Sequence, residues 1–265
     1  SGGWLVVGDS QVLGMGVPWA ESFPALLGAG WHNGGVPAYG VPDALAAADA
    51  LAGPLGVQGV VVMVNQANDW DDGLAPITER YSAGASGWLV GTRHRGSFSG
   101  WLWSSPLLES HLLYLGGLLF APGMLAELTG GSAQPPAWMQ DPAGQSAMTA
   151  EFAEAIAAFS RAHPSITTVA CFLPVDLAAA EGQLERSPFG AAAKALPEGS
   201  PKPWADTTLR DQLRDALAAQ GASEDGALRF VDLLPALAGQ DEAFLDGDFH
   251  LSAEGHALVA EALRP

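Results

Sequence analysis

The feature that most constrains the fold of this chain is a repeated alternation between short apolar runs and helical patterns. Four apolar runs have the length of buried strands and are too short for helices: 4–7, 59–64, 167–173 and 228–231. A fifth, weaker candidate for a strand lies at 31–33. Between the runs, large apolar residues recur every three or four positions, as in Phe152, Ile156 and Phe159, or Leu209, Leu213 and Leu217. Strands that alternate with helices pair in parallel through right-handed crossovers. The sequence therefore predicts a three-layer α/β/α sandwich with about five mostly parallel strands.

The length fits one large domain or two small ones, and we expect a single folded domain over residues 1–265. Hydrophobic residues make up 48% of the 265 positions and charged residues only 15%, which argues against disorder and allows a sizeable core. Residues 71–146 do not follow the alternation, and we expect them to form a mainly helical insertion after the third strand. Residues 178–205 form a second, looser excursion, in which several prolines exclude a long helix. Excursions of this length are usually lids, binding loops or interfaces.

The formal net charge of −18 excludes several classes of partner. Such a surface would repel phosphate backbones and anionic membranes, so we expect no nucleic-acid binding. The single cysteine, Cys171, cannot form an internal disulfide and lies in an apolar run typical of a core. No Cys and His cluster of the zinc-binding type is visible, so we expect no metal.

The most apolar stretch, 98–128, is a poor transmembrane helix because Pro106, Glu109, His111 and a glycine pair interrupt it. Its large side chains could instead form an apolar lid over a binding cleft, or pack as a small helical subdomain. The sequence leaves open whether a signal peptide or anchor precedes Ser1, and it does not indicate the oligomeric state. Of the possible locations, we favour a periplasmic or secreted one over a cytoplasmic one.

The first candidate for chemistry is Ser10, which follows Gly8 and Asp9 at the end of the first predicted strand. In open α/β sheets, ligands bind at the carboxyl ends of the strands, so this hydroxyl is well placed for catalysis. A Gly-Asp-Ser tripeptide also occurs in ordinary turns. Serine needs a base to take its proton, and a third group to orient that base.

A candidate base appears near the carboxyl terminus, in the segment Asp246-Gly247-Asp248-Phe249-His250. His250 directly precedes a predicted C-terminal helix, for which Ser252 is a suitable N-cap. Asp246 and Asp248 lie four and two residues before the histidine, and either could hold the imidazole in its working tautomer. The alternative is a solvated acidic loop with a surface histidine.

Two further loops could stabilise a developing oxyanion. The Gly- and Pro-rich segment 33–40 follows the second predicted strand and can aim backbone N–H groups, and Asn68 follows the third strand with a side-chain amide. Because the loops after the first three strands share one edge of the sheet, we expect Ser10, the region of Ala38 and Asn68 to converge on one cleft.

Taken together, these segments resemble the four sequence blocks of the SGNH hydrolases, the superfamily of GDSL-type esterases and lipases. Gly8-Asp9-Ser10-Gln11 resembles the first block, with Gln11 in place of the leucine of the name-giving motif. The segment 33–40 resembles the second block, although its oxyanion glycine falls on Ala38. The segment 66–69 resembles the third block, with Gln66 in place of glycine and Asn68 retained.

The fourth block departs most from the pattern of the family. The commoner spacing, Asp-x-x-His, would put the acid at Gly247, whereas the Asp-x-His variant fits Asp248 and His250. Asp246 is the fallback acid, and His256 is interpreted as structural. The resemblance covers both ends of the chain and the predicted strands, and it does not cover the two excursions.

The resemblance implies an SGNH-type hydrolase fold, which is flavodoxin-like, and a serine ester hydrolase with Ser10, His250 and Asp248 as its catalytic residues. The backbone N–H groups of Ser10 and Ala38, with the amide of Asn68, would form the oxyanion hole. No cofactor is required, and the expected substrate is a small-molecule or carbohydrate ester with a short-to-medium acyl group. Two alternatives stay open: an O-acyltransferase that uses the same site, and a non-catalytic binding domain on the same fold. The replacements at positions 38 and 66 favour the latter slightly.

Overall fold

The fold is described from a computed structural model of the chain. The described residues are 2–73, 75–83, 89–91, 142–180, 182–194 and 208–264. The chain divides into two compact units: residues 1–74 with 135–265, and residues 75–134. The stretch 98–128, for which an apolar lid and a small helical subdomain were both left open, lies outside the described residues, so both alternatives stay predictions.

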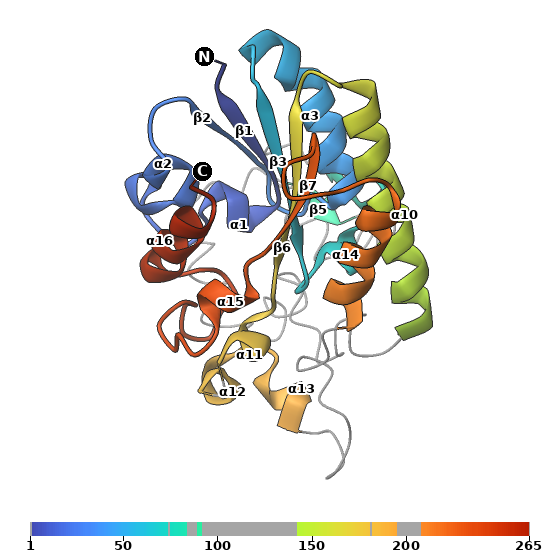
Figure 1. The fold of residues 1–265 in the computed structure, drawn as a ribbon. Coiled ribbons are helices and arrows are strands. Elements are labelled where there is room, and N and C mark those ends of the chain that lie inside the picture. Colours follow the sequence, from blue (N-terminus) through green and yellow to red (C-terminus); the bar gives the residue numbers. More distant parts are fainter. Residues whose placement is uncertain are drawn as a thin grey trace. The chain divides into compact units, whose positions relative to one another are not determined.

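The larger unit is built on a parallel sheet of five strands (Figure 1). In chain order the strands are β1 (Trp4–Gly8), β2 (Trp31–Gly35), β3 (Gly59–Asn65), β6 (Thr167–Leu173) and β7 (Leu228–Asp232). Their spatial order is β2-β1-β3-β6-β7, which is the flavodoxin-like order of a doubly wound sheet. The sequence-based prediction of about five parallel strands is confirmed.

The register aligns the carboxyl ends of the strands that precede the candidate loops. Gly8 of β1 is opposite Gly35 of β2, and Val7 is opposite Val62 of β3. The segments that leave these three strands therefore start from one edge of the sheet, as expected for a binding edge.

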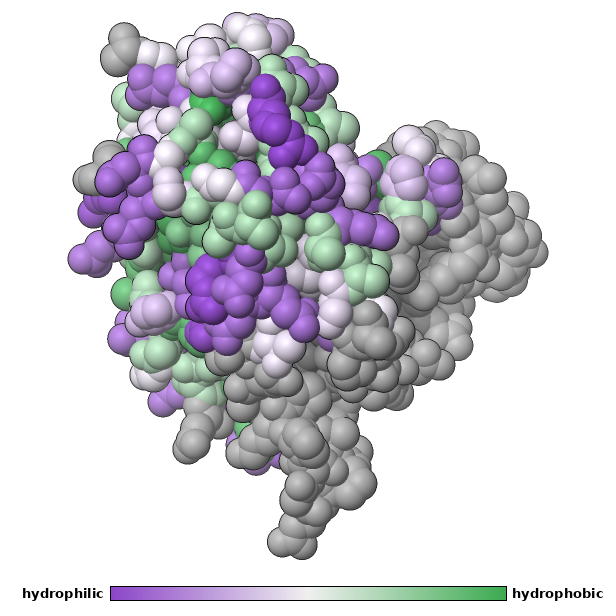
Figure 2. All heavy atoms as spheres, turned by 45° about the vertical axis from the view of Figure 1, so that its right-hand side comes forward, coloured by the Kyte–Doolittle hydropathy of each residue, from purple (hydrophilic) through white to green (hydrophobic). Residues whose placement is uncertain are grey.

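One face of the sheet is covered by three long helices: α3 (Val41–Leu55), α10 (Pro142–Ala162) and α14 (Thr208–Ala219). Alternate strand residues such as Val7, Val62 and Phe172 pack against them, because successive side chains of a strand point to opposite faces. The predicted helical patterns are confirmed, since Phe152, Ile156 and Phe159 and the three leucines of α14 are all buried. Figure 2 turns this helical side forward and shows hydrophilic side chains gathered on it, with apolar ones between them.

The opposite face is covered by shorter helices: α1 (Ser10–Leu13), α2 (Phe23–Leu26), α15 (Leu234–Leu237) and α16 (Ala253–Ala262). The intervening strand residues Val6, Met63 and Cys171 point to this side and are buried with them. Cys171 thus lies in the core, as predicted, where burial raises the pKa of its thiol. Ser252 is the N-cap of α16, its Oγ accepting a hydrogen bond from the Gly255 N–H at 3.1 Å.

Short helices complete the larger unit. They are η1 (Trp19–Glu21), a 3₁₀ turn, and the α-helices α4 (Asp69–Asp72), α11 (Asp176–Ala179), α12 (Gln183–Arg186) and α13 (Gly190–Lys194). The helices α12 and α13 lie within the second excursion predicted from the sequence, 178–205, and α11 overlaps its start. In the smaller unit, the described elements are α5 (Ile77–Arg80) and the antiparallel pair β4 (Tyr81–Ala83) and β5 (Leu89–Gly91). Within the described parts of both units, no helix combines the length and the apolar character needed to cross a bilayer.

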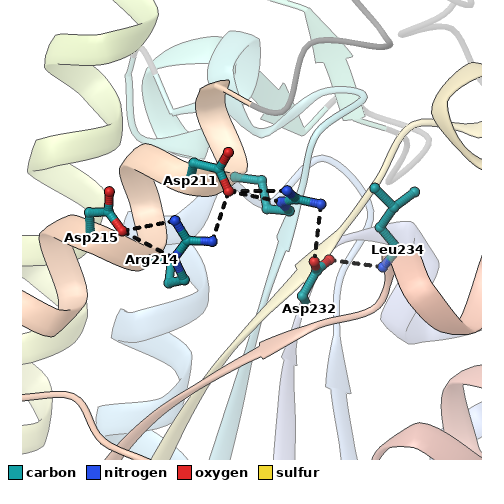
Figure 3. A network of polar contacts seen from close by, with 6 residues as sticks. Asp211, Arg214, Asp215, Asp232 and Leu234 are labelled. Atoms are coloured by element: carbon teal, nitrogen blue, oxygen red, sulfur yellow. Dashed lines mark hydrogen bonds and ion pairs between the residues drawn. The ribbon is translucent and has the colours of Figure 1, made fainter.

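A polar network ties the start of α14 to the end of β7 (Figure 3). Arg214 contacts both Asp211 and Asp215, and Arg210 bridges Asp211 to Asp232. The other oxygen of Asp232 accepts the N–H of Leu234 at 2.9 Å, where α15 begins. The contacts join a helix on one face of the sheet to a helix on the other through the end of an edge strand.

Candidate active site

Ser10 lies at the start of α1, directly after the turn that ends β1. The turn is tight: a Cβ at Gly8 would lie 2.7 Å from Cγ2 of Val12 and 3.0 Å from Cβ of Met63, so a glycine is needed there. The helix is capped by Asp9, whose Oδ1 accepts the Gln11 N–H at 3.0 Å. The Ser10 side chain is thereby held at the carboxyl edge of the sheet, where the residue is 7% exposed.

The structure brings His250 to this serine. The Nε2 atom of His250 lies 2.8 Å from Oγ of Ser10, and its Nδ1 atom lies 2.6 Å from Oδ1 of Asp248. Because a carboxylate only accepts hydrogen bonds, Nδ1 carries the proton and Nε2 is left as the acceptor for the serine hydroxyl. This is the tautomer that a general base needs.

The two candidate acids lie in different surroundings. Asp248 accepts both the ring Nδ1–H of His250 and the backbone N–H of His250, the latter at 3.1 Å. These bonds lower the pKa of the Asp248 carboxyl and keep it ionised, and the bond to the His250 ring has the largest effect. Asp246 instead pairs with the guanidinium of Arg186, and its side chain is 78% exposed. The structure thus brings Asp248 to the histidine and holds Asp246 on Arg186.

The loop after β2 contains an alanine in the left-handed backbone conformation. Ala38 has a φ of 64°, the only positive φ outside glycine among the described residues. Tyr39 N–H donates to the Val36 carbonyl at 3.1 Å, which closes a β-turn with Pro37 in its second position and Ala38 in its third. Proline excludes a positive φ before Ala38, so the turn is of type II, which requires a positive φ at its third residue. Alanine is strained there, by roughly 1–2 kcal/mol, and glycine would not be.

Asn68 is held at both ends of its carboxamide. Its Oδ1 accepts from Nδ2 of Asn65 at 2.7 Å, and its own Nδ2 donates to Oδ2 of Asp72 at 2.7 Å. The two contacts fix which end of the amide is the donor, and the Asn68 side chain also favours the charged form of the Asp9 carboxyl.

Asn65 is a residue of this site that the sequence analysis missed. Its Nδ2 donates to Oδ2 of Asp9 at 2.8 Å as well as to Asn68, so one amide joins the loop of the serine to the loop of Asn68. Asp9, missed as well, is buried, and burial raises the pKa of its carboxyl although Asn65 and the Gln11 N–H favour the charged form. The available signal was a polar residue at the end of an otherwise apolar strand.

The loop that carries His250 is braced by the second excursion. Arg186 donates to the Asp241 carbonyl at 2.7 Å, and its own carbonyl accepts the Gly247 N–H at 2.8 Å. Phe189 stacks on Phe249 with ring centroids 5.5 Å apart, and Phe249 stacks on the His250 ring at 4.6 Å. Residues 183–189 therefore pack against the loop that carries His250 and help to hold it in place.

His256 lies apart from this chemistry. It is fully buried and stacks on Phe23, whose backbone N–H donates to its Nδ1 at 3.3 Å. Burial lowers the pKa of His256 to about 4, so the ring is neutral in the core. In the part of the chain that the structure describes, no group of three or more metal-ligating side chains gathers.

No protein-family model matches the chain, and no curated protein matches it significantly. Solved structures with a similar fold do exist. TesA is 14% identical, with 98% of this chain and 94% of TesA covered at a TM-score of 0.49. A proposed lipolytic protein of the G-D-S-L family from Desulfitobacterium hafniense DCB-2 is 13% identical, with coverage of 99% and 100% and a TM-score of 0.48. The psychrotrophic esterase EstA from Pseudoalteromonas sp. is 10% identical, with coverage of 99% and 94% and a TM-score of 0.49. The solved structures that this chain resembles thus include an esterase and a protein of the G-D-S-L family.

Proposed function

We propose that this protein is a serine ester hydrolase that works through an acyl-Ser10 intermediate. The observation that carries the proposal is the continuous hydrogen-bond chain from Ser10 Oγ through both nitrogens of His250 to Asp248, at 2.8 and 2.6 Å. A serine, a base in the correct tautomer and an ionised acid are the parts that nucleophilic acyl transfer needs.

In the first step, Ser10 Oγ forms a bond to the acyl carbon while its proton passes to Nε2 of His250. The negative charge of Asp248 stabilises the imidazolium that results. When the tetrahedral intermediate collapses, the bond to the alcohol breaks and His250 returns the proton to the leaving oxygen. The products of this half-reaction are the free alcohol and the acyl-enzyme.

The negative charge that develops on the acyl oxygen is assigned to three donors: the backbone N–H groups of Ser10 and Ala38, and the side-chain amide of Asn68. Asn65 and Asp72 support the third donor, because they hold the amide in one orientation before the substrate binds. Removal of one such donor typically costs roughly 3–4 kcal/mol of transition-state stabilisation.

In the second half-reaction, His250 takes a proton from water as the water oxygen forms a bond to the acyl carbon. The bond from that carbon to Ser10 Oγ then breaks, His250 returns the proton to Oγ, and the free acid is released. A sugar hydroxyl in place of water would make the protein an O-acyltransferase with the same residues in the same roles. The substrate class that we propose is a carbohydrate O-acetyl ester or another short-to-medium acyl ester.

The test is the hydrolysis of p-nitrophenyl acetate, butyrate and octanoate by the wild type and by Ser10→Ala, together with labelling by a fluorophosphonate. We expect turnover and labelling by the wild type and neither by the variant, with mass spectrometry placing the label on Ser10. Label on another serine, or equal turnover by both proteins, would refute the proposal. Adding a sugar acceptor and measuring acyl-sugar against free acid separates transfer from hydrolysis.

A further inference from the structure

Gln11, near the amino terminus of the chain, contacts the loop that carries His250 near the carboxyl terminus. Its Nε2 donates to the carbonyl of Phe249 at 2.9 Å, and its Oε1 accepts the N–H of Leu251 at 2.9 Å. One side chain thus bonds the residue before the histidine and the residue after it. Gln11 is 1% exposed, so water does not compete effectively for either bond.

The orientation of this amide is unambiguous. A backbone carbonyl only accepts and a backbone N–H only donates, so the NH₂ group must face Phe249 and the oxygen must face Leu251. Of the side chains that are uncharged at neutral pH, no other of the same length offers one donor and one acceptor in this arrangement.

The other end of Gln11 is equally fixed. Its backbone N–H is bonded to Asp9, and Asp9 is bonded to Asn65, which also holds Asn68. Ser10 and Gln11 are consecutive, so the same short helix carries the proposed nucleophile and the side chain that bonds to the loop of the proposed base. A displacement of the histidine loop relative to Ser10 would have to break the Gln11 bonds.

The histidine loop also has ties that do not involve Gln11. The Leu245 N–H donates to the His250 carbonyl at 2.9 Å, Phe244 pairs with Leu251, and Asp248 holds the ring. Loss of the Gln11 bonds should therefore leave the loop folded. We expect the loss of these bonds to change the position of the His250 imidazole relative to Ser10, a residue 240 positions away in the sequence.

We propose that Gln11 is a positioning residue, which sets the distance between Ser10 Oγ and His250 Nε2. The inference rests on the proposed function of that pair. Gln11 does not touch the reacting atoms, and its effect on the rate is exerted through His250. This positioning role predicts that kcat depends on the two hydrogen bonds of the Gln11 side chain and that KM does not.

The first variant is Gln11→Leu, which keeps most of the volume and removes both bonds. Displacements of the order of 1 Å in a catalytic group can cost roughly 100-fold in rate, so we expect kcat to fall by roughly 10- to 100-fold with KM within about twofold. Fluorophosphonate labelling of Ser10 should slow by a similar factor. Gln145→Leu is the matched control, because Gln145 is also a buried glutamine, its Nε2 has no hydrogen-bond partner among the described residues, and it lies on α10. It should retain wild-type kcat.

The second variant, Gln11→Glu, separates positioning from packing. When protonated, the introduced carboxyl can donate to the Phe249 carbonyl and accept from the Leu251 N–H, as the amide does. When ionised, it can only accept, and it faces the carbonyl with a negative charge. We therefore expect kcat of this variant to approach the wild-type value at low pH and to fall with an additional limb as the pH rises. A role in packing alone would leave the pH profile unchanged.

A readout independent of turnover is the proton NMR signal of the His250 Nδ1–H that is bonded to Asp248. Gln11→Leu should shift this signal or speed its exchange with water, and Gln145→Leu should leave it unchanged. If Ser10→Ala abolishes no turnover but the signal responds to Gln11→Leu, the proposed function falls and the positioning of His250 stands. Unchanged kcat and an unchanged signal in a folded Gln11→Leu protein would overturn the inference.

Discussion

The imidazole of His250 lies 2.8 Å from the hydroxyl of Ser10, although 240 residues separate them in the sequence. One comes from the turn after the first strand and the other from the loop before the last helix. Their contact exists because β1 is an interior strand of the sheet and α16 covers the same face of the sheet as α1. The site is therefore a consequence of the doubly wound topology.

The first prediction concerns the acid. Asp248→Asn should lower kcat by roughly 10³- to 10⁴-fold, because an amide at this position favours the wrong tautomer of His250. Asp246→Asn should change kcat by less than about threefold, because this exposed carboxylate is bonded to Arg186. Steady-state hydrolysis of p-nitrophenyl butyrate measures both. The opposite ranking would assign the acid to Asp246.

The second prediction concerns the strained turn. Ala38→Gly should raise the free energy of unfolding by up to about 1 kcal/mol, since relief of roughly 1–2 kcal/mol of strain is partly offset by the greater freedom of glycine in the unfolded chain. Ala50→Gly is the control, because Ala50 is exposed within α3 and glycine there should cost about 1 kcal/mol. Urea denaturation gives both values. Destabilisation by Ala38→Gly as large as in the control would contradict strain at this turn.

The third prediction concerns His256 and acid stability. Its pKa is lowered by burial from 6.5 to about 4, so the unfolded chain takes up a proton at a higher pH than the folded one. The stability from this group is present above pH 6.5 and is lost as the pH falls toward 4, by about 3 kcal/mol. His256→Gln should abolish this pH dependence, whatever its stability at neutral pH. Denaturant titrations at several pH values compare the two slopes, and parallel slopes would refute the assignment.

The fourth prediction concerns Asp176, a fully buried carboxyl at the start of α11. Its pKa is raised from 3.8 to about 6, chiefly by burial, so the folded chain holds the proton at a pH where the unfolded chain has lost it. This stability is present below pH 3.8 and is lost as the pH rises through 6, by about 3 kcal/mol. Asp176→Asn should therefore be more stable than the wild type at pH 7, and the difference should vanish toward pH 4.

The last two groups act in opposite directions between pH 4 and 6. The wild type should consequently show a shallow dependence of stability on pH in this window, while each single variant exposes the slope of the other group. A double variant that is flat over the same window is the consistency check. A double variant with a steep slope would mean that other groups control acid stability.

Much of the fold was determined by the sequence alone, because side-chain alternation is a local property. Val6 and Val7 are neighbours in a strand, so they must point to opposite faces, and both faces of the sheet are indeed covered by helices. The same holds for the leucines of α14, whose spacing places them on one helical face. Ser10 and Asn68 were candidates because they follow predicted strands, His250 was a candidate because it directly precedes the last predicted helix, and the family resemblance favoured Asp248 over Asp246.

Only the tertiary structure decided how these residues are held. By residue type alone, either Asp246 or Asp248 could orient His250, and they differ in the structure because the loop turns Asp248 toward His250 and Asp246 toward Arg186. The positive φ of Ala38 follows from the closing of a turn around Pro37. The bonds of Gln11 and Asn65 join segments that are remote in the sequence, and no local pattern specifies which partner a buried amide will find. Local spacing determines the elements, whereas hydrogen bonds between distant loops depend on how the whole sheet brings their ends together.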